Sequence, residues 1–213
     1  MTGGLVGIAL VSLGMVLTPG PNMIYLVSRS ISQGRRAGLI SLVGVALGFM
    51  AYLTATCLGL TAVFAYVPVA YTALKLAGAA YLLWMAWNAV RPGGASVFQP
   101  RELAVERPRK LFAMGLFTCL LNPKIAILYL SLLPQFIDPA MGHVLLQSLA
   151  LGSVQIAIGT LVNALIAISA GGLAAFLARR PVWLRVQRYA MGTVLGIFAV
   201  RMVADRSKAL VPA

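Results

Sequence analysis

The stretch "MVLTPGPNMIYLV", residues 15–27, interrupts a long apolar run with residues that disfavour an α-helix. The interruption consists of five consecutive residues, Thr18, Pro19, Gly20, Pro21 and Asn22. Proline lacks the N–H donor of a helix and clashes with the carbonyl one turn back, whereas glycine between two prolines permits a sharp bend. The sequence therefore predicts a helix break here, with a new helix that begins near Pro21 or Asn22.

The apolar run around this break is one of six that are long enough to cross a membrane. The chain has 213 residues, of which 61% are hydrophobic and 10% charged, whereas about a quarter of the residues in a soluble domain are charged. A helix needs about 20 mostly apolar residues to span the hydrocarbon core. The six runs cover approximately residues 4–28, 39–65, 72–90, 111–134, 144–177 and 189–204. We therefore predict an all-α integral membrane protein, with residues 1–213 forming a single domain of six transmembrane helices.

The basic residues indicate how these six helices lie in the membrane. Most arginines fall after the first run, in the loop 91–110, and between the fifth and sixth runs. The opposite loops, 66–71 and 135–143, carry only Asp138 as an acidic or basic residue besides one histidine. The positive-inside rule then places the basic loops in the cytoplasm and both termini outside. The net charge of +13 is explained by this topology and by anionic lipid head groups, so we do not expect nucleic-acid binding. The first run has no basic residue before it and is not expected to be a cleaved signal peptide.

A second, similar break occurs about half of the chain length after the first. "LLNPK" places Asn122, Pro123 and Lys124 in the middle of the fourth run. We interpret the chain as two repeats of three spans each, approximately 1–90 and 111–213. Because three is an odd number, the second repeat would cross the membrane inverted, as in many secondary transporters. The broken first and fourth helices would then face one another near the midplane.

The breaks are also candidates for a binding site. Unpaired backbone groups inside a membrane must face protein or a wet cavity, so both breaks should line one. Freed carbonyls accept hydrogen bonds from ammonium groups, a helix N-terminus favours a carboxylate, and the Asn22 amide can both donate and accept. This chemistry suits a zwitterion. The alternative is a proline kink that only shapes helix packing.

Lys124 is the only ionisable residue well inside any of the runs. An intramembrane lysine costs about 2.5–3.5 kcal/mol on insertion scales. All four acidic residues lie in loops or near an end, so its partners must be carbonyls, water or a bound anion. We expect a substrate carboxylate, with Asn122 beside it; the alternative is an ammonium that snorkels to the surface. Burial disfavours a charged ammonium, which also makes Lys124 a candidate group for proton coupling.

Further polar and small residues lie on the remaining runs. Gln155 and Asn163 share a helical stripe in the fifth run, where they either line the cavity or form bonds between helices. Small residues let helices approach closely, and we assign this packing role to Gly44, Gly48, Gly152 and Gly159. Such small-residue faces also permit a homodimer.

The sequence offers little for enzymatic, metal or cofactor chemistry. His143 is the only histidine, so no cluster of histidine, cysteine and acidic residues with metal-ligand spacing is present. Cys57 and Cys119 lie in separate apolar runs, do not form a C-x-x-C motif, and are expected to be buried free thiols. We therefore expect neither an enzyme nor a bound cofactor or metal.

Taken together, the motifs resemble those of the LysE/RhtB superfamily of bacterial amino-acid exporters. The matching segments occur in order over most of the chain: "TPGPNM" (18–23), "GVALG" (44–48), "KLAGAAYLLWMA" (75–86), "LLNPK" (120–124) and "SLLPQFI" (131–137). The resemblance implies export of amino acids or close derivatives across the bacterial inner membrane, driven by the proton gradient. The sequence looks most like the RhtB branch, which is associated with homoserine, threonine, leucine and similar neutral compounds.

The absence of acidic residues from the apolar runs favours neutral over basic substrates, because a cationic side chain would meet Lys124 and no negative partner. Three alternatives remain at this point. The chain could export basic amino acids, export another small solute or a cation, or form a passive channel.

Overall fold

The computed structural model describes residues 2–18, 20–66 and 103–178, together with scattered residues between 76 and 91 and between 182 and 204. Within this part of the chain every element is helical. The longer elements are α1 (Thr2–Leu17), α2 (Pro21–Gln33), α3 (Arg35–Tyr66), α5 (Pro108–Leu120), α6 (Pro123–Ile127) and α7 (Val144–Ala178). Between α6 and α7 lie a π-helix, η1 (Leu128–Leu132), and two 3-10 turns, η2 (Leu133–Phe136) and η3 (Pro139–Met141). The third and sixth predicted runs fall largely outside the described residues.

Two helices are long and apolar enough to cross a membrane by themselves. These are the stretches Arg35–Gly59 of α3 and Val144–Gly172 of α7, which have 25 and 29 residues. Two further candidate spans are bent pairs: α1 with α2 at 52°, and α5 with the run Pro123–Phe136 at 50°. The described residues therefore hold two to four candidate spans by length and composition. The predicted breaks in the first and fourth runs are present as these two bends.

Two helix boundaries differ from the sequence prediction. Arg29 was expected in a loop after the first run, but α2 continues to Gln33 and the Arg29 side chain is only 5% exposed. Only Gly34 separates α2 from α3, and its φ of +88° is a backbone conformation that suits glycine. α5 begins at Pro108, so the last residues of the predicted loop 91–110 are helical.

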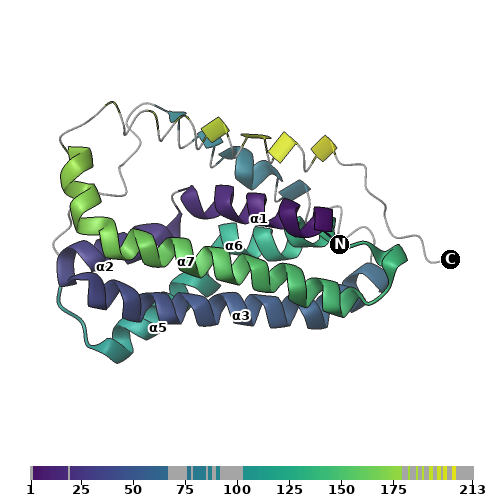
Figure 1. Cartoon of the computed structure of the whole chain (residues 1–213), viewed down its shortest axis with the longest axis horizontal. Helices are drawn as coiled ribbons and strands as arrows, with labels where there is room; N and C mark the ends of the chain where they lie inside the picture. Colours follow the sequence, from purple (N-terminus) through teal and green to yellow (C-terminus); the bar gives the residue numbers. More distant parts are fainter. Residues whose placement is uncertain are drawn as a thin grey trace.

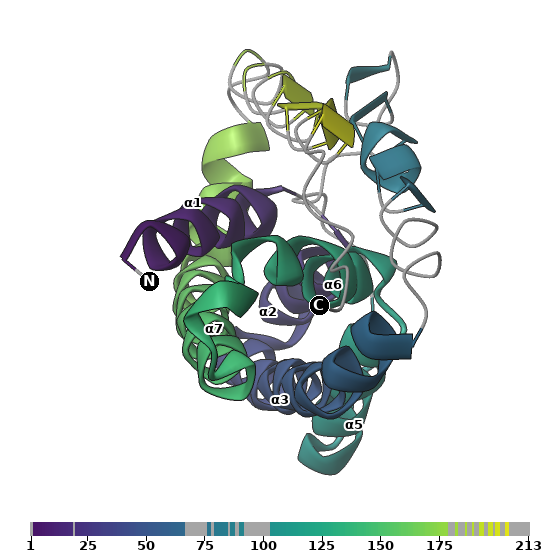
Figure 2. The same cartoon turned by 90° about the vertical axis from the view of Figure 1, so that its right-hand side faces the viewer.

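The helices form a bundle whose interior contains the segments that follow the breaks. α3 and α7 run side by side along the long axis of the molecule (Figure 1). Seen along the helices, α2 and α6 lie near the centre, with α1, α7 and α3 around them (Figure 2). Leu26 of α2, Phe49 of α3 and Tyr129 of η1 are fully or almost fully buried in one core. Both breaks therefore lead the chain into the interior of the bundle.

α3 and α5 are in backbone contact at two reciprocal glycines. A Cβ atom on Gly44 would collide with the carbonyl oxygen of Phe112, and one on Gly115 would collide with the carbonyl oxygen of Ser41. Each helix therefore places a glycine against the main chain of the other. Small residues at such positions allow this close approach, and they are enriched where helices pack in membranes.

The other small residues singled out in the sequence also lie at helix contacts. A Cβ on Gly48 would lie 2.6 Å from the Cβ of Cys119, across the same α3–α5 contact. On α7, Gly152 faces the Leu53 side chain, and a Cβ on Gly159 would lie 3.2 Å from the Phe49 ring. α7 is thus fitted closely against α3.

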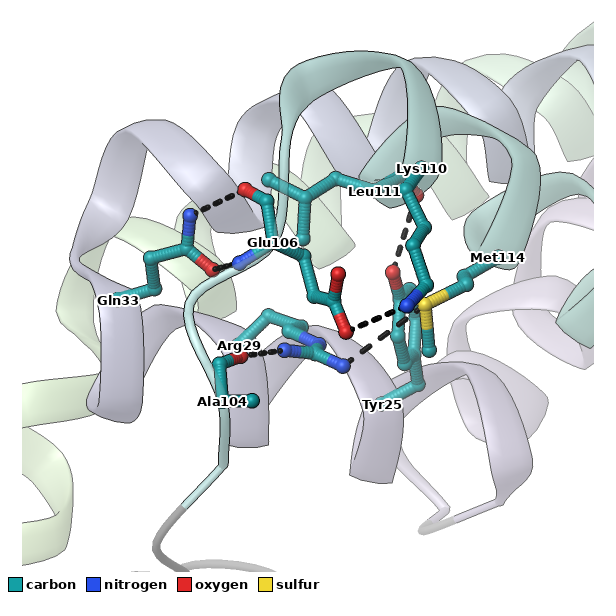
Figure 3. A network of polar contacts seen from close by, with 8 residues as sticks. All are labelled: Tyr25, Arg29, Gln33, Ala104, Glu106, Lys110, Leu111 and Met114. Carbon is teal, nitrogen blue, oxygen red and sulfur yellow. Dashed lines mark hydrogen bonds and ion pairs between the residues drawn. The ribbon is translucent and has the colours of Figure 1, made fainter.

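A polar network joins the end of α2 to α5 and to the residues before it (Figure 3). Arg29 Nη1 donates to the Ala104 carbonyl at 2.9 Å. Gln33 forms a double hydrogen bond with the Glu106 main chain, donating to its carbonyl at 2.7 Å and accepting from its N–H at 2.9 Å. Tyr25 donates to the Leu111 carbonyl at 3.0 Å. We call these contacts the α2–α5 clamp.

Replacing Gln33 with alanine should loosen the α2–α5 clamp and destabilise the protein. Both main-chain groups of Glu106 would lose their partner, which we expect to cost about 1–2 kcal/mol of the free energy of unfolding. The measurement is the thermal unfolding midpoint in detergent. Ser32→Ala is the matched control, because the Ser32 hydroxyl bonds only to the Ser28 carbonyl within α2. Equal midpoints for the two variants would show that the pair of hydrogen bonds between Gln33 and Glu106 contributes nothing to stability.

Candidate functional site

The first break lies between α1 and α2. Pro19 and Pro21 have no N–H, so the carbonyls of Met15 and Leu17 lose their usual helical partners. The Thr18 hydroxyl donates back to the Gly14 carbonyl at 2.8 Å and closes the end of α1. Pro21 is the first residue of α2, as predicted, and Pro19 lies outside the described residues.

The second break lies between α5 and α6. Asn122 caps α6, because its Oδ1 accepts a hydrogen bond from the Lys124 main-chain N–H at 3.0 Å. Pro123 is the first residue of α6, a position where its missing N–H is tolerated. The cap takes the N–H that would otherwise bond to the Leu120 carbonyl, and this carbonyl accepts instead from the Tyr52 hydroxyl at 2.7 Å.

Lys124 connects the two breaks. Its ammonium donates to the carbonyls of Met15 at 2.9 Å and Thr18 at 2.6 Å, and its side chain is only 4% exposed. The Met15 carbonyl also accepts from the Thr18 main-chain N–H at 3.2 Å, so the cation from the second break is a second donor to this carbonyl of the first. Gly20 makes room for this contact, because a Cβ there would lie 2.8 Å from Nζ. The ammonium points into the first break and does not snorkel.

A narrow cavity lies beside Lys124. The free space for the centre of a water molecule is about 20 Å³, which is enough for water but far below the several hundred Å³ of typical ligand sites. Its polar lining comes from α1, α2, α6 and α7 and consists of Ser12, Asn22, Lys124, Gln155 and Asn163. Apolar side chains, among them Phe49, complete the wall. The cavity in this structure is therefore too small for an amino acid.

Several polar atoms around this cavity are buried without a hydrogen-bond partner in the described residues. They are both amide atoms of Asn22, the hydroxyl oxygen of Ser12 and Nδ2 of Asn122. The Cys119 thiol lies beside the Asn22 amide but does not form a hydrogen bond of normal geometry with it. An unsatisfied buried polar group costs about 1–3 kcal/mol, so a cluster of them is typical of a place that receives a polar ligand or water.

The two polar residues of α7 each use one half of their amide. Asn163 Nδ2 donates to the Gly159 carbonyl at 2.7 Å, so its oxygen remains as an acceptor. Gln155 Oε1 accepts a hydrogen bond from the Tyr129 hydroxyl, so its NH₂ group remains as a donor. Both residues line the cavity, which was one of the two alternatives left open by the sequence.

Most residues singled out in the sequence meet in one place. Asn22, Lys124, Gln155 and Asn163 line the cavity, whereas Thr18 and Gly20 contact Lys124. The Asn122 oxygen caps α6 and Asn122 is not among the lining residues, but its Nδ2 is buried without a partner, so its role in binding stays a prediction. Two residues of the site were not predicted from the sequence. Ser12 lines the cavity one helical turn before Val16, and Tyr129 bonds to Gln155.

No group of three or more histidine, cysteine or acidic side chains among the described residues could hold a metal ion. Cys57 and Cys119 are free thiols. Lys124 is the one ionisable residue in the described cavity lining, and no carboxylate lies there to balance its charge when it is protonated.

Comparison with known proteins places the chain in a family. The model of a family described as LysE type translocator matches residues 13–206. A homoserine/homoserine lactone efflux protein of Salmonella typhi is 30% identical over 89% of this chain and 91% of the relative. A leucine efflux protein of an Enterobacter species is 31% identical over 58% of this chain and 59% of the relative.

An uncharacterised membrane protein of Pseudomonas aeruginosa is 28% identical over 87% of this chain and 85% of the relative. No solved structure shows a significant match. The family match covers nearly the whole length, including both helix breaks and all of the cavity lining except Ser12, so this chain belongs to the LysE type translocators, which are membrane transport proteins and not enzymes.

Proposed function

We propose that this protein is a secondary active exporter of neutral amino acids or close derivatives, of the homoserine, threonine and leucine type. The observation that carries the proposal is the Lys124 ammonium, which donates to the Met15 and Thr18 carbonyls at the first break, beside a cavity lined with amides and no carboxylate. The names of the Salmonella and Enterobacter relatives support the substrate class.

The contacts of Lys124 suggest how a zwitterion would bind. A substrate carboxylate would attract the ammonium of Lys124 away from the carbonyls of Met15 and Thr18. Those carbonyls would then accept hydrogen bonds from the ammonium group of the substrate. Each buried group keeps a partner in both states, which limits the cost of binding in a low-dielectric site. The cavity must widen for this exchange, because its present volume does not admit an amino acid.

Charge complementarity favours neutral over basic substrates. A lysine or arginine side chain would place a second cation near Lys124, and no acidic residue lies in the cavity lining to balance it. Export of basic amino acids, of a cation or of another small solute is therefore the weaker alternative, as is a passive channel.

For the whole chain we propose six spans in two inverted repeats, approximately 1–90 and 111–213, joined by a cytoplasmic loop at 91–110. The order of the described elements supports this, because a broken helix precedes a long helix twice, first α1–α2 with α3 and then α5–α6 with α7. The breaks would lie near the midplane of the inner membrane, with both termini outside. A homodimer through small-residue faces stays a prediction.

We further propose that Lys124 couples export to the proton gradient. Burial disfavours the charged form of an ammonium, whereas a bound carboxylate favours it, so substrate and proton would influence one another at this residue. Proton-driven export then requires that Lys124 alternately binds a substrate carboxylate and releases a proton during the transport cycle.

The function can be tested in inverted inner-membrane vesicles, in which export appears as uptake. A panel of labelled amino acids is offered with and without an imposed pH gradient. We expect neutral amino acids of the homoserine, threonine and leucine type to accumulate above the external concentration, and a protonophore to abolish this accumulation. Uptake that only equilibrates would indicate a channel, and accumulation of lysine or arginine would indicate a basic exporter. Vesicles that accumulate none of the panel would contradict the proposed function.

A further inference from the structure

A buried tyrosine outside the cavity contacts one of its lining residues. Tyr129 belongs to the π-helix η1 and has no exposed surface. Its hydroxyl donates to Gln155 Oε1 on α7, a residue that lines the cavity together with Lys124. π-helical turns are uncommon and frequently lie at functional sites, because they shift side chains out of the regular helical register.

The ring of Tyr129 is itself held in place. It stacks on the ring of Tyr52 with the two centroids 5.8 Å apart and the planes 14° from parallel. Tyr52 in turn donates to the Leu120 carbonyl at the end of α5, directly before the second break. The hydroxyl of Tyr129 is therefore aimed at Gln155 by a chain of contacts that starts at the break.

This contact decides which half of the Gln155 amide is available to a ligand. A glutamine amide carries an acceptor oxygen and a donor NH₂ group, and a free side chain can present either of them. Because Tyr129 donates to the oxygen, the NH₂ group remains for the cavity. The position of Gly159 agrees, since a Cβ there would lie 3.2 Å from Gln155 Nε2, and Gly159 also lines the cavity.

We propose that Tyr129 is a positioning residue that fixes the Gln155 amide with its N–H donors toward the cavity, so that Gln155 and Lys124 together recognise the carboxylate of the substrate. The inference rests on the proposed function. It adds the residue that determines whether the Gln155 amide presents a donor or an acceptor to the substrate. Without Tyr129 the amide can turn its oxygen toward the carboxylate, which opposes binding.

The first test replaces Tyr129 with phenylalanine, which keeps the stacked ring and removes only the hydroxyl. Uptake of labelled leucine, with labelled homoserine as a parallel probe, is measured in inverted vesicles over a range of concentrations. We expect the half-saturating concentration to rise about tenfold, the typical effect of losing one hydrogen bond to a charged group, while the maximal rate changes less than about twofold. Tyr25→Phe, which also loses a tyrosine hydrogen bond but whose hydroxyl contacts Ser41 and Leu111 and no residue of the cavity lining, should leave both values unchanged.

A double substitution separates positioning from a merely structural role. Gln155→Leu alone should raise the half-saturating concentration about as much as Tyr129→Phe, because it removes the donor itself. If Tyr129 acts through Gln155, adding Tyr129→Phe to Gln155→Leu should produce no further rise. Effects that multiply would overturn the proposal, as would a Tyr129→Phe variant with the affinity of the wild type.

A second variant keeps the inference testable even if Tyr129→Phe does not fold. Gln155→Glu preserves the shape of the side chain and its contact with Tyr129, but it presents an oxygen to the cavity in place of the NH₂ group. The ability of unlabelled leucinamide, which lacks a carboxylate, to compete with labelled leucine should then increase at least about fivefold relative to that of unlabelled leucine. An unchanged ratio would overturn the inference. Wild-type vesicles that transport neither probe would instead contradict the proposed function.

Discussion

Replacing Lys124 with alanine is expected to lower amino-acid uptake into inverted vesicles about 100-fold or more, with normal amounts of protein in the membrane. The ammonium is the positive group that would face the substrate carboxylate, and removing one partner of a buried charge pair typically costs about 2–5 kcal/mol. Each 1.4 kcal/mol corresponds to a factor of ten in affinity. The Thr18 carbonyl would lose the ammonium as a donor and the Met15 carbonyl would keep only the Thr18 N–H, but the adjacent cavity has room for water to replace the ammonium.

The measurement is the initial rate of labelled leucine uptake, normalised to the amount of transporter by immunoblot. Lys110→Ala serves as the control, because Lys110 is an exposed cation whose partner is Glu106 on the surface. Its removal should leave uptake unchanged. Full uptake by the Lys124→Ala variant would remove this residue from both substrate binding and proton coupling.

Replacing Gly44 or Gly115 with valine is expected to prevent α3 and α5 from packing. Each new Cβ would meet a main-chain carbonyl oxygen, and a helix backbone cannot move aside as a flexible side chain can. Overpacking a core typically costs about 1–3 kcal/mol, and we expect a loss at or above the upper end of this range for either variant. Little folded protein should therefore survive extraction into detergent.

Gly59→Val provides the matched control on α3. It introduces the same side chain into the same helix, but a Cβ at Gly59 has no atom within 4 Å. Size-exclusion chromatography and the thermal unfolding midpoint should resemble those of the wild type. A Gly115→Val variant as stable as Gly59→Val would show that the two backbones separate without cost.

The sequence predicts the two breaks well because their cause is local. Pro21 cannot continue a helix that began before it, and the composition around Asn122 and Pro123 has the same effect, so both bends follow from covalent chemistry. The contact between the breaks was predictable from the cost of burying Lys124 without an acidic partner. The identity of the carbonyls that Lys124 reaches could not be predicted, because it depends on the angle between the helices.

Other parts of the site depend on interactions between residues distant in the chain. Asn122 was expected beside a ligand, and the sequence did not indicate that its oxygen would cap the helix that begins at Pro123, which leaves only its NH₂ group for such a role. The π-helical register that aims Tyr129 at Gln155 has no signature in the sequence. Likewise, the sequence alone placed Arg29 in a loop, because its partner, the carbonyl of Ala104, lies far along the chain and accepts its hydrogen bond only in the folded protein.

The reciprocal glycines have a consequence for motion during transport. Where two main chains touch at Gly44 and Gly115, neither helix can slide or roll without first parting from the other. We therefore expect α3 and α5 to behave as one stationary frame. Among the described elements, we then expect any widening of the cavity to involve α1 and the N-terminal half of α2, which lie outside this frame and outside the close contact of α7 with α3 at Gly152 and Gly159. The contact that would hold this frame together is made by two residues that have no side chain beyond a hydrogen atom.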